Sequence, residues 1–475
     1  MISLLALAAS LPIPLVSALP HAHISVNAHT RFQQVDGFGF SEAFQRARDI
    51  YGKDGLSPEN RTRVLDLLFS DTRGAGLTIV RNGIGSSNSS IKDFMNSIEP
   101  FSPGSPSAPP HYVWDRNDSG QVWLSHEAAS YGVNTFYADA WSAPGYMKTN
   151  DDDSNGGYLC GVSNTSCASG DWKQAYANYL VQYIHFYQQV GIKVTHLGFL
   201  NEPQEDVTYA SMLSDGTQAA DFIKVLAPTV KAAGLDVKLT CCDGVGWEEQ
   251  RAMLPGLQAG GPEHSAESYL SVITAHGYNS PPTTPLETSL PVWMTEWADL
   301  NDNYTAAWYE NGAPGEGLTW ANRIQDAFTR SNVSAFLHWI GAENGTSNSP
   351  LINLNGDSYV ASKRLWAFGQ FSRFVRPGAV RIDAASSDPL VTVSAFQNKE
   401  NGVVATQVIN NADTDYEVEV DLTGHGRLVS VVQPYLTNNE HDLEASSPII
   451  TLALGAATKF TSIVPARSLV SFVSK

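Results

Sequence analysis

Two short apolar segments of this chain each end in a glutamate. The segment LGFLNEP, residues 197–203, delivers Asn201 and Glu202, and the segment VWMTEW, residues 292–297, delivers Glu296. Two carboxyl groups about 5 Å apart can cleave a glycosidic bond with retention of configuration, one as acid and base and the other as nucleophile. We therefore interpret Glu202 as the acid/base and Glu296 as the nucleophile.

Neighbouring polar residues either support this pair or compete with it. Asn201 could hydrogen-bond the 2-hydroxyl of a sugar, a contact that strengthens in the transition state. Either glutamate alone could equally be a salt-bridged residue at a strand end, but two at matching strand ends favour catalysis. Glu343 is the best substitute if the strand count is off by one. The competing carboxylates at predicted strand ends are Asp36, Asp139, Asp243, Asp299 and Glu343.

Aromatic residues gather at the same predicted strand ends. Sugar rings have flat apolar faces edged with hydroxyls, so sugar-binding clefts use aromatic platforms with polar rims. A single tryptophan is more often a core residue, whereas a cluster at one rim favours binding. The cluster comprises Trp141, Tyr146, Tyr278, Trp297 and Trp339.

The elements that must position these residues follow a repeated pattern. Short runs rich in Val, Ile, Leu and Phe alternate with longer stretches of helical spacing, which is typical of βα units. One such helix is predicted at residues 172–190, where Tyr176, Leu180, Tyr183 and Ile184 share a face. The eight predicted strands are residues 35–40, 77–83, 135–142, 195–200, 237–242, 272–278, 292–296 and 335–340.

Eight strands, each followed by a helix, predict an α/β fold of the (β/α)8 TIM-barrel type, whose catalytic groups sit at the carboxyl ends of the strands. Glu202 and Glu296 fall on the fourth and seventh strands, which face each other across such a barrel. An open doubly wound sheet is the alternative. Its Gly-rich phosphate turn needs a third glycine that the GFG at residues 37–39 lacks.

The pattern changes after residue 376. Short alternating segments separated by turn residues, such as the Asn pairs at 410–411 and 438–439, predict a β-sandwich over residues 377–475. Residues 35–376 then form the catalytic barrel. The predicted sandwich strands are residues 390–395, 403–409, 416–422, 428–435, 449–454 and 468–473.

The first eighteen residues have the pattern of an export signal. An apolar run over residues 4–15 precedes the small residues at 16–18, which predicts a signal peptide of residues 1–18. A membrane span needs about twenty apolar residues, and Pro12 and Pro14 interrupt this run. We therefore expect a secreted, extracellular protein without a membrane anchor. Glycosylation sequons fit this route, at Asn60, Asn88, Asn117, Asn164, Asn303, Asn332 and Asn344.

The four cysteines suit an oxidising compartment. Cys160 and Cys167 flank a short Gly/Ser loop, and we expect them to form a disulfide. The adjacent Cys241 and Cys242 could be free and buried or form a vicinal disulfide, and the sequence does not choose between these states. No zinc spacing occurs. We expect no metal and no cofactor.

The net charge of −19 argues against nucleic acid as a partner, because a polyanion would be repelled and the sequence contains no basic stripe. We expect a monomer whose partner is a polysaccharide.

Several of these segments resemble glycoside hydrolase family 30. The resemblance implies that Glu202 is the acid/base, that Glu296 is the nucleophile, and that the chain's start helps build a β-sandwich beside the barrel. Residues 19–34, with a strand at 23–26, suit that role. The likeness spans nearly the whole mature chain, and its motifs are VDGFGFSEAFQRA at 35–47, WSAPGYMKTN at 141–150, NEP at 201–203 and TEW at 295–297.

Within the family the chain is most similar to the fungal xylanase branch, subfamily 7, through FQRA at residues 44–47. This implies an endo-β-1,4-xylanase acting on xylan or glucuronoxylan; some members release xylobiose. The alternative is an endo-β-1,6-galactanase or β-1,6-glucanase on the same scaffold. An inactive carbohydrate-binding protein is a third interpretation, against which both glutamates count.

Two arginines are candidates for the substrate site. In so acidic a protein, a glucuronate carboxylate needs a local cation, and a guanidinium can hold it with two parallel hydrogen bonds. Arg46 is placed for this, although it could equally be a structural residue paired with Glu42 or Asp49. Arg81 is expected to brace Glu202 or Glu296. The predicted substrate-binding residues are Arg46, Arg81, Trp141, Asn201, Tyr278, Trp297 and Trp339.

Overall fold

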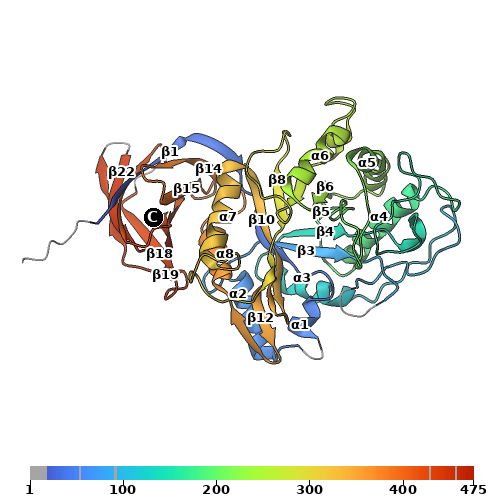
Figure 1. The fold of residues 1–475 in the computed structure, drawn as a ribbon, viewed down its shortest axis with the longest axis horizontal. Coiled ribbons are helices and arrows are strands. Elements are labelled where there is room, and N and C mark those ends of the chain that lie inside the picture. Colours follow the sequence, from blue (N-terminus) through green and yellow to red (C-terminus); the bar gives the residue numbers. More distant parts are fainter. Residues whose placement is uncertain (1–18, 53–54, 90–93, 427–428, 455–456) are drawn as a thin grey trace, which may run out of the picture.

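The computed structural model describes residues 19–475 except 53–54, 90–93, 427–428 and 455–456. The predicted signal peptide, residues 1–18, lies outside the described residues. A sandwich of strands and a barrel of strands and helices lie side by side along the long axis of the molecule (Figure 1).

Parallel strands form the barrel. The last of them, β10, pairs with both β8 and β2, which closes the sheet and excludes the doubly wound alternative. All eight predicted strands are found, so the predicted (β/α)8 fold is confirmed. In order they are β2 (Gly37–Ser41), β3 (Ile79–Ile84), β4 (Thr135–Ala140), β5 (His196–Leu197), β6 (Lys238–Gly244), β7 (Val272–His276), β8 (Val292–Glu296) and β10 (Val333–Glu343).

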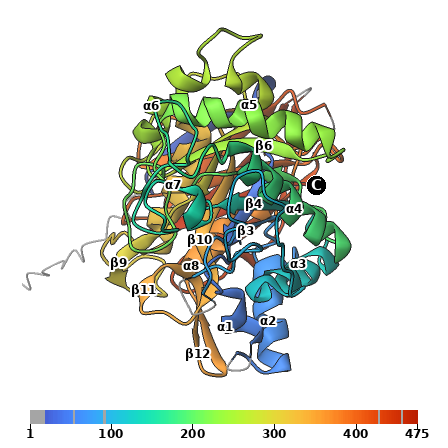
Figure 2. The same cartoon turned by 90° about the vertical axis from the view of Figure 1, so that its right-hand side faces the viewer.

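Helices surround the barrel, seen from its free end in Figure 2. The predicted apolar face of the helix at 172–190 is confirmed, since Tyr176, Leu180, Tyr183 and Ile184 of α4 are all buried. The helices are α1 (Ala47–Tyr51), α2 (Pro58–Phe69), α3 (Gln121–Ser130), α4 (Lys173–Gln189), α5 (Gly216–Ala232), α6 (Trp247–Leu257), α7 (Gly317–Arg330) and α8 (Lys363–Ser372), with short 3-10 turns η1 (Asp118–Gly120), η2 (Gly145–Met147) and η3 (Ala266–Tyr269).

Additional short strands follow β8 and β10 at the carboxyl ends of the barrel strands. β9 (Asp299–Asn303) pairs with β11 (Ser347–Asn348) to join the segments that follow β8 and β10. β12 (Pro350–Asn355) pairs parallel with the end of β10, and β13 (Ser358–Ala361) pairs antiparallel with β12 as a hairpin.

The sandwich includes the chain's start, as predicted. β1 (His21–Gln34) pairs antiparallel with β14 and parallel with β17, and its alternating buried residues join the sandwich core. The sequence patterns missed β14 and β22. The remaining strands are β14 (Val380–Ser386), β15 (Val391–Gln397), β16 (Val404–Asn410), β17 (Tyr416–Thr423), β18 (Val431–Thr437), β19 (Glu444–Ala445), β20 (Ile449–Ile450), β21 (Leu452–Leu454), β22 (Ala457–Val464) and β23 (Ser468–Ser474).

Helices α7 and α8 lie between barrel and sandwich (Figure 1). Phe328 of α7 packs edge-on against Phe396 of β15, with ring centroids 5.7 Å apart. Gln370 of α8 donates to the Thr437 hydroxyl at 2.8 Å. The sandwich therefore supports the two helices that follow β8 and β10, and β8 carries Glu296.

Both cysteine pairs are oxidised. Cys160 and Cys167 form the predicted disulfide, with 5.5 Å between their Cα atoms. Cys241 and Cys242 also form a disulfide, which settles the choice that the sequence left open.

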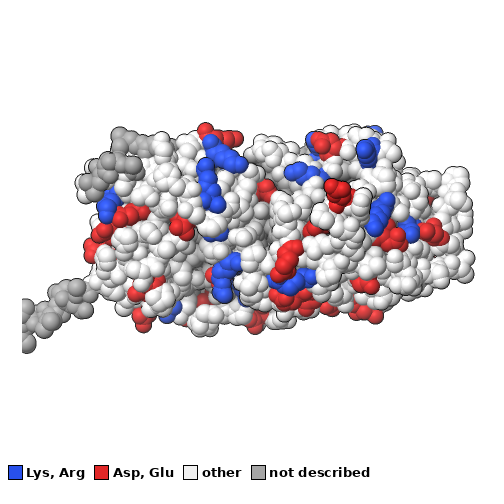
Figure 3. Space-filling model, turned by 90° about the horizontal axis from the view of Figure 1, so that it is seen from above, with Lys and Arg blue, Asp and Glu red and all other residues white. Residues whose placement is uncertain are grey.

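The charged surface residues are dispersed. On the face in Figure 3, Lys and Arg side chains are interspersed with Asp and Glu. Among the described helices, none has the length and apolar character needed to cross a membrane.

Candidate active site

The structure brings Glu202 and Glu296 together. Glu202 follows β5 and Glu296 ends β8, and a carboxylate oxygen of each lies within 4.8 Å of the other. Retaining glycosidases hold their carboxyl groups about 5 Å apart, whereas inverting enzymes leave roughly 6.5 to 9.5 Å for a water molecule. The separation therefore fits nucleophilic attack by one of the two carboxylates.

The backbone that carries Glu202 is shaped for this placement. A Cβ at Gly198 would lie 2.1 Å from an Asp139 carboxylate oxygen, so a side chain there would displace Asp139. Glu202 has a left-handed φ of 47°, and its N–H donates to the Asp243 carbonyl at 2.8 Å. Such a conformation costs a non-glycine residue about 1–3 kcal/mol and is found mostly at functional sites.

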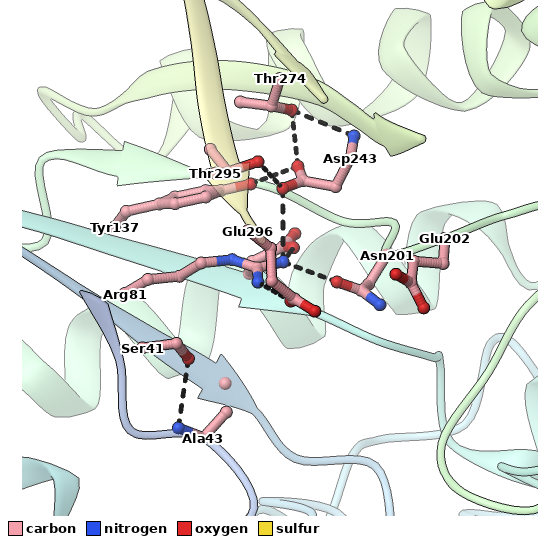
Figure 4. A network of polar contacts seen from close by, with 12 residues as sticks. Ser41, Ala43, Arg81, Tyr137, Asn201, Glu202, Asp243, Thr274, Thr295 and Glu296 are labelled. Atoms are coloured by element: carbon pink, nitrogen blue, oxygen red, sulfur yellow. Dashed lines mark hydrogen bonds and ion pairs between the residues drawn. The ribbon is translucent and has the colours of Figure 1, made fainter. Parts of the chain in front are cut away.

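Arg81, on β3, extends toward Glu296 and Asn201 (Figure 4). Its guanidinium donates to Glu296 Oε2 at 2.5 Å, to Asn201 Oδ1 at 2.6 Å and to Asp139 Oδ2 at 2.6 Å. Arg81 therefore braces Glu296 as expected, and its inclusion among the substrate-binding residues is corrected, because its side chain is fully buried and its hydrogen bonds go to protein oxygens. Asn201 accepts from Arg81 through its oxygen, which leaves its amide group as a donor.

Asp243, at the end of β6, is the buried hub of the network in Figure 4. Its carboxylate accepts from Tyr137 at 2.6 Å, Thr274 at 2.5 Å and Thr295 at 2.6 Å. Burial would raise the pKa of Asp243, but the charge of Arg81 and hydrogen bonding with His276 lower it to about 2. Asp243 therefore stays ionised.

His276, at the end of β7, lies between the two catalytic glutamates. Its Nδ1 is 2.9 Å from Glu202 Oε1, its Nε2 is 3.3 Å from Asp243 Oδ1, and Nε2 is also 3.9 Å from Glu296 Oε2. Burial alone would lower the pKa of His276, but the charge of Glu296 and hydrogen bonds with Asp243 and Glu202 raise it to about 10. The ring is therefore an imidazolium near neutral pH, with both nitrogens donating.

The side chains of Glu202, His276 and Glu296 are close enough to one another to be considered as a metal site. A protonated imidazole has no lone pair for a metal ion, and Arg81 already compensates the charge of Glu296. Glu202, His276 and Glu296 therefore suit proton transfer and nucleophilic attack better than they suit metal binding.

Two tyrosines complete the polar shell around the glutamates. The hydroxyl of Tyr278, predicted as an aromatic platform, instead donates to Glu296 Oε1 at 2.9 Å. Tyr209, which sequence reasoning missed, lines the cleft beside Glu202, and burial and the charge of Glu202 raise its pKa. Burial raises the pKa of Glu296, while the charges of His276 and Arg81 oppose the rise.

A cleft of about 690 Å³ opens over this network. The predicted residues Arg46, Trp141, Tyr278, Trp297 and Trp339 line it, whereas Asn201 and Arg81 lie beneath its surface. Asp299, one of the competing carboxylates, also lines the cleft. Sequence reasoning missed the rest of the lining, which is Phe44, Glu205, Tyr209, Val245, Asn279, Ala298, Leu300, Asn301, Asp302, Pro314 and Arg323, beside the two glutamates.

The tryptophans differ in what they offer a sugar. Trp339 is half-buried, whereas Trp141 is almost fully covered and lies over the Arg81 guanidinium at 4.4 Å. Gly277 packs so closely on the Trp297 ring that a Cβ would lie 2.3 Å from it. Tyr146 is not part of the rim, since it packs on Trp172 and donates to the Glu99 carbonyl. Trp339 is therefore the best-placed platform of the predicted cluster.

The competing carboxylates have other partners. Asp36 accepts from Trp293 at the opposite end of the barrel strands. Glu343 accepts from Arg46 Nε at 2.6 Å, an ion pair that the sequence did not predict.

A retaining carboxylate pair at the ends of the fourth and seventh strands of a (β/α)8 barrel defines a glycoside hydrolase. The model of O-Glycosyl hydrolase family 30 matches residues 21–254, and that of the glycosyl hydrolase family 30 β-sandwich domain matches residues 378–472. The solved structure of the catalytic domain of GH30 xylanase C from Talaromyces cellulolyticus is 44% identical, with a TM-score of 0.86, over 95% of this chain and 100% of that one. The chain belongs to glycoside hydrolase family 30.

Curated relatives are more distant. Putative glucosylceramidase 2 of Caenorhabditis elegans is 24% identical over 85% of this chain and 79% of its own. Endo-1,6-beta-D-glucanase BGN16.3 of Trichoderma harzianum is 24% identical over 75% of this chain and 72% of its own. Glucuronoxylanase XynC of Bacillus subtilis is 26% identical over 39% of each chain.

Proposed function

We propose that this protein is a secreted, retaining endo-β-1,4-xylanase that acts on xylan or glucuronoxylan. The observation that carries the proposal is the 44% identity to a family 30 xylanase across 95% of the chain, over both barrel and sandwich.

The reaction is a double displacement. Glu296 attacks the anomeric carbon while Glu202 protonates the departing glycosidic oxygen, which gives a glycosyl ester on Glu296. Glu202 then takes a proton from water as that water attacks the anomeric carbon, and the bond to Glu296 breaks to release its carboxylate. Arg81 and Tyr278 hold the Glu296 oxygens during both steps, since each donates to a different one.

Arg46 is our predicted contact for a glucuronate branch, and this stays a prediction. It lines the cleft, but its Nε is engaged by Glu343 at 2.6 Å. A branch carboxylate at Arg46 must therefore share the guanidinium with Glu343.

The second candidate substrate is a β-1,6-glucan or β-1,6-galactan, because relatives at 24% identity include a protein named as an endo-1,6-β-glucanase. Product analysis on glucuronoxylan, arabinoxylan, β-1,6-glucan and β-1,6-galactan separates the candidates. Internal cleavage of the two xylans supports the proposal, and turnover confined to a β-1,6-linked polymer contradicts it.

Export is part of the same proposal. It rests on the signal-like residues 1–18, and two disulfides and exposed sequon asparagines at 88, 164, 303, 332 and 344 support it. Asn60 and Asn117 are half-buried and are weaker candidates for glycosylation. Amino-terminal sequencing of the culture-medium protein should begin near residue 19. We also propose that the enzyme is a monomer, which sedimentation would test.

A further inference from the structure

One cation in the wall of the cleft has no anionic partner among the described residues. Arg323, on α7, lines the cleft that contains Glu202 and Glu296. Its guanidinium carbon lies over the ring of Trp297 at 4.6 Å and over the ring of Trp320 at 4.8 Å. Its one hydrogen bond is a long contact of 3.4 Å from Nη1 to the Pro314 carbonyl.

Asp299, whose charge acts on Arg323, does not form an ion pair with it. The negative charge of Asp299 attracts Arg323 without a hydrogen bond between the two side chains. The carboxylate oxygens of Asp299 instead accept from the Asn348 amide at 2.9 Å and the Asn301 N–H at 3.2 Å. Burial lowers the pKa of Arg323 to about 10, although the negative charge of Asp299 acts to raise it. Arg323 thus keeps its proton near neutral pH, but without a bonded counter-charge.

Three other buried or half-buried arginines have more or shorter polar contacts than Arg323, although the Nε atoms of Arg81 and Arg364 have no acceptor among the described residues. Arg81 has three carboxylates, Arg46 has Glu343, and Arg364 donates to the Thr305 and Pro350 carbonyls and to the Asn348 side chain. A partly buried charge without a partner is costly, so the arrangement at Arg323 is best explained by a counter-charge that a ligand brings.

Stacking prepares the guanidinium for such a ligand. Two indole rings contact the guanidinium, and Arg323 lines the cleft, so its side chain is held in place where a ligand can reach it. The N–H edge of a guanidinium fits a carboxylate with two parallel hydrogen bonds. In a protein of net charge −19, an acidic sugar would otherwise be repelled.

The position is distinct from that of Arg46. Arg323 lies over Trp297, whose carbonyl accepts from the N–H of Trp339, and Trp339 in turn contacts Phe44, next to Arg46 in the loop after β2. The two arginines therefore come from different segments and have different contacts, because Arg46 donates to Glu343 and to the Phe44 carbonyl whereas Arg323 stacks on Trp297 and Trp320.

We propose that Arg323 forms a binding position for the carboxylate of a uronic-acid group on the polysaccharide, separate from Arg46. This inference rests on the proposed action on substituted polysaccharides. It makes Arg323 a determinant of preference for acidic over neutral chains.

The test measures binding by calorimetry to the inactive Glu296→Gln protein. The probes are two matched pairs: a xylotetraose with and without one 4-O-methylglucuronate branch, and a β-1,6-galactotetraose with and without a terminal glucuronate. The quantity compared is the ratio of affinities for the acidic and neutral members. We expect Arg323→Gln to lower this ratio at least about tenfold, and Arg323→Lys to recover part of it, because a point charge lacks the planar fork.

Arg330→Gln is the matched control. It removes an arginine from the same helix whose side chain is 59% exposed and pairs only loosely with Asp326 at 3.7 Å. We expect the ratio to be unchanged in this variant. Melting temperatures of all variants show whether each is folded when it is titrated.

The outcomes separate this inference from the proposed function. A preference that appears only on the galactan pair and falls in Arg323→Gln supports the inference and contradicts the xylanase proposal. A preference that survives Arg323→Gln and is lost in Arg46→Ala overturns the inference while leaving the xylanase proposal intact. The absence of any acidic preference in the parent protein also overturns it.

Discussion

Nδ1 of His276 lies 2.9 Å from Oε1 of Glu202, and the other ring nitrogen, Nε2, is directed at Asp243 and Glu296. One buried cation therefore lies between the acid/base and the nucleophile. Glu202 must gain and lose a proton in each catalytic cycle while Glu296 loses and regains its charge. A fixed positive charge between the two glutamates limits how much a change in the charge of Glu296 shifts the pKa of Glu202, and the reverse.

The pH dependence of stability tests this arrangement. The pKa of His276 is raised from 6.5 to about 10 in the folded protein, so its protonation stabilises the fold fully below pH 6.5 and this contribution is lost as pH rises toward 10. Urea unfolding should show a fall in unfolding free energy across that range, and His276→Gln should remove this part of the fall. An unchanged dependence in His276→Gln would rule out the imidazolium. The exposed His264→Gln is the control.

Glu202→Ala should affect substrates according to their leaving groups. An aryl glycoside with an acidic phenol needs no protonation, so its first step should stay fast while polysaccharide cleavage falls by about 10²–10⁴-fold. Azide should then accelerate the slow second step, because it attacks the anomeric carbon of the glycosyl ester without a general base and releases Glu296. Equal losses on both substrates, without rescue, would exclude Glu202 as the acid/base.

Tyr278→Phe should lower kcat by roughly tenfold or more, since a hydrogen bond to a charged group is worth about 1.5–3 kcal/mol. The cause is loss of the 2.9 Å contact with Glu296 Oε1. Steady-state kinetics of this variant beside Tyr269→Phe, which alters a half-exposed tyrosine on η3, measures the effect. Parallel losses in both variants would show that the effect is not specific to the nucleophile.

The Cys160–Cys167 disulfide closes a short loop, so its loss should cost only about 2 kcal/mol by the chain-entropy estimate. The Cys160→Ser, Cys167→Ser double variant should melt a few degrees lower and keep wild-type kcat. Non-reducing peptide mapping of the parent protein should find the two residues linked. Two free thiols in that map would refute the bridge.

The sequence predicted the features that are encoded locally. Apolar runs marked the barrel strands, and polar residues at the ends of two runs marked Glu202 and Glu296. The exceptions depend on distant partners. His276 lies within the predicted strand at residues 272–278, yet only the folded barrel places it against Glu202. Arg323 sits in a helix, where nothing local indicates that its side chain reaches the cleft.

Other errors have the same cause. Alternation alone did not reveal β14 or β22, because the structure extends the sandwich sheet through pairing with β1 and β17. Tyr146 was predicted at the rim because it follows a strand, but its chain turns away and buries it on Trp172. Arg81 was counted as substrate-binding, although carboxylates from three other strands enclose it.

Mass spectrometry of a trapped intermediate tests the central claim most directly. A 2-deoxy-2-fluoro xylobioside with a good leaving group should form a glycosyl ester and hydrolyse it slowly, because the fluorine destabilises the oxocarbenium-like transition state. Intact protein should gain the mass of one fluorinated disaccharide residue, and the peptide map should place it on Glu296. The Glu296→Gln protein, folded by circular dichroism, should gain nothing. Label on another residue, or in Glu296→Gln, would contradict the account.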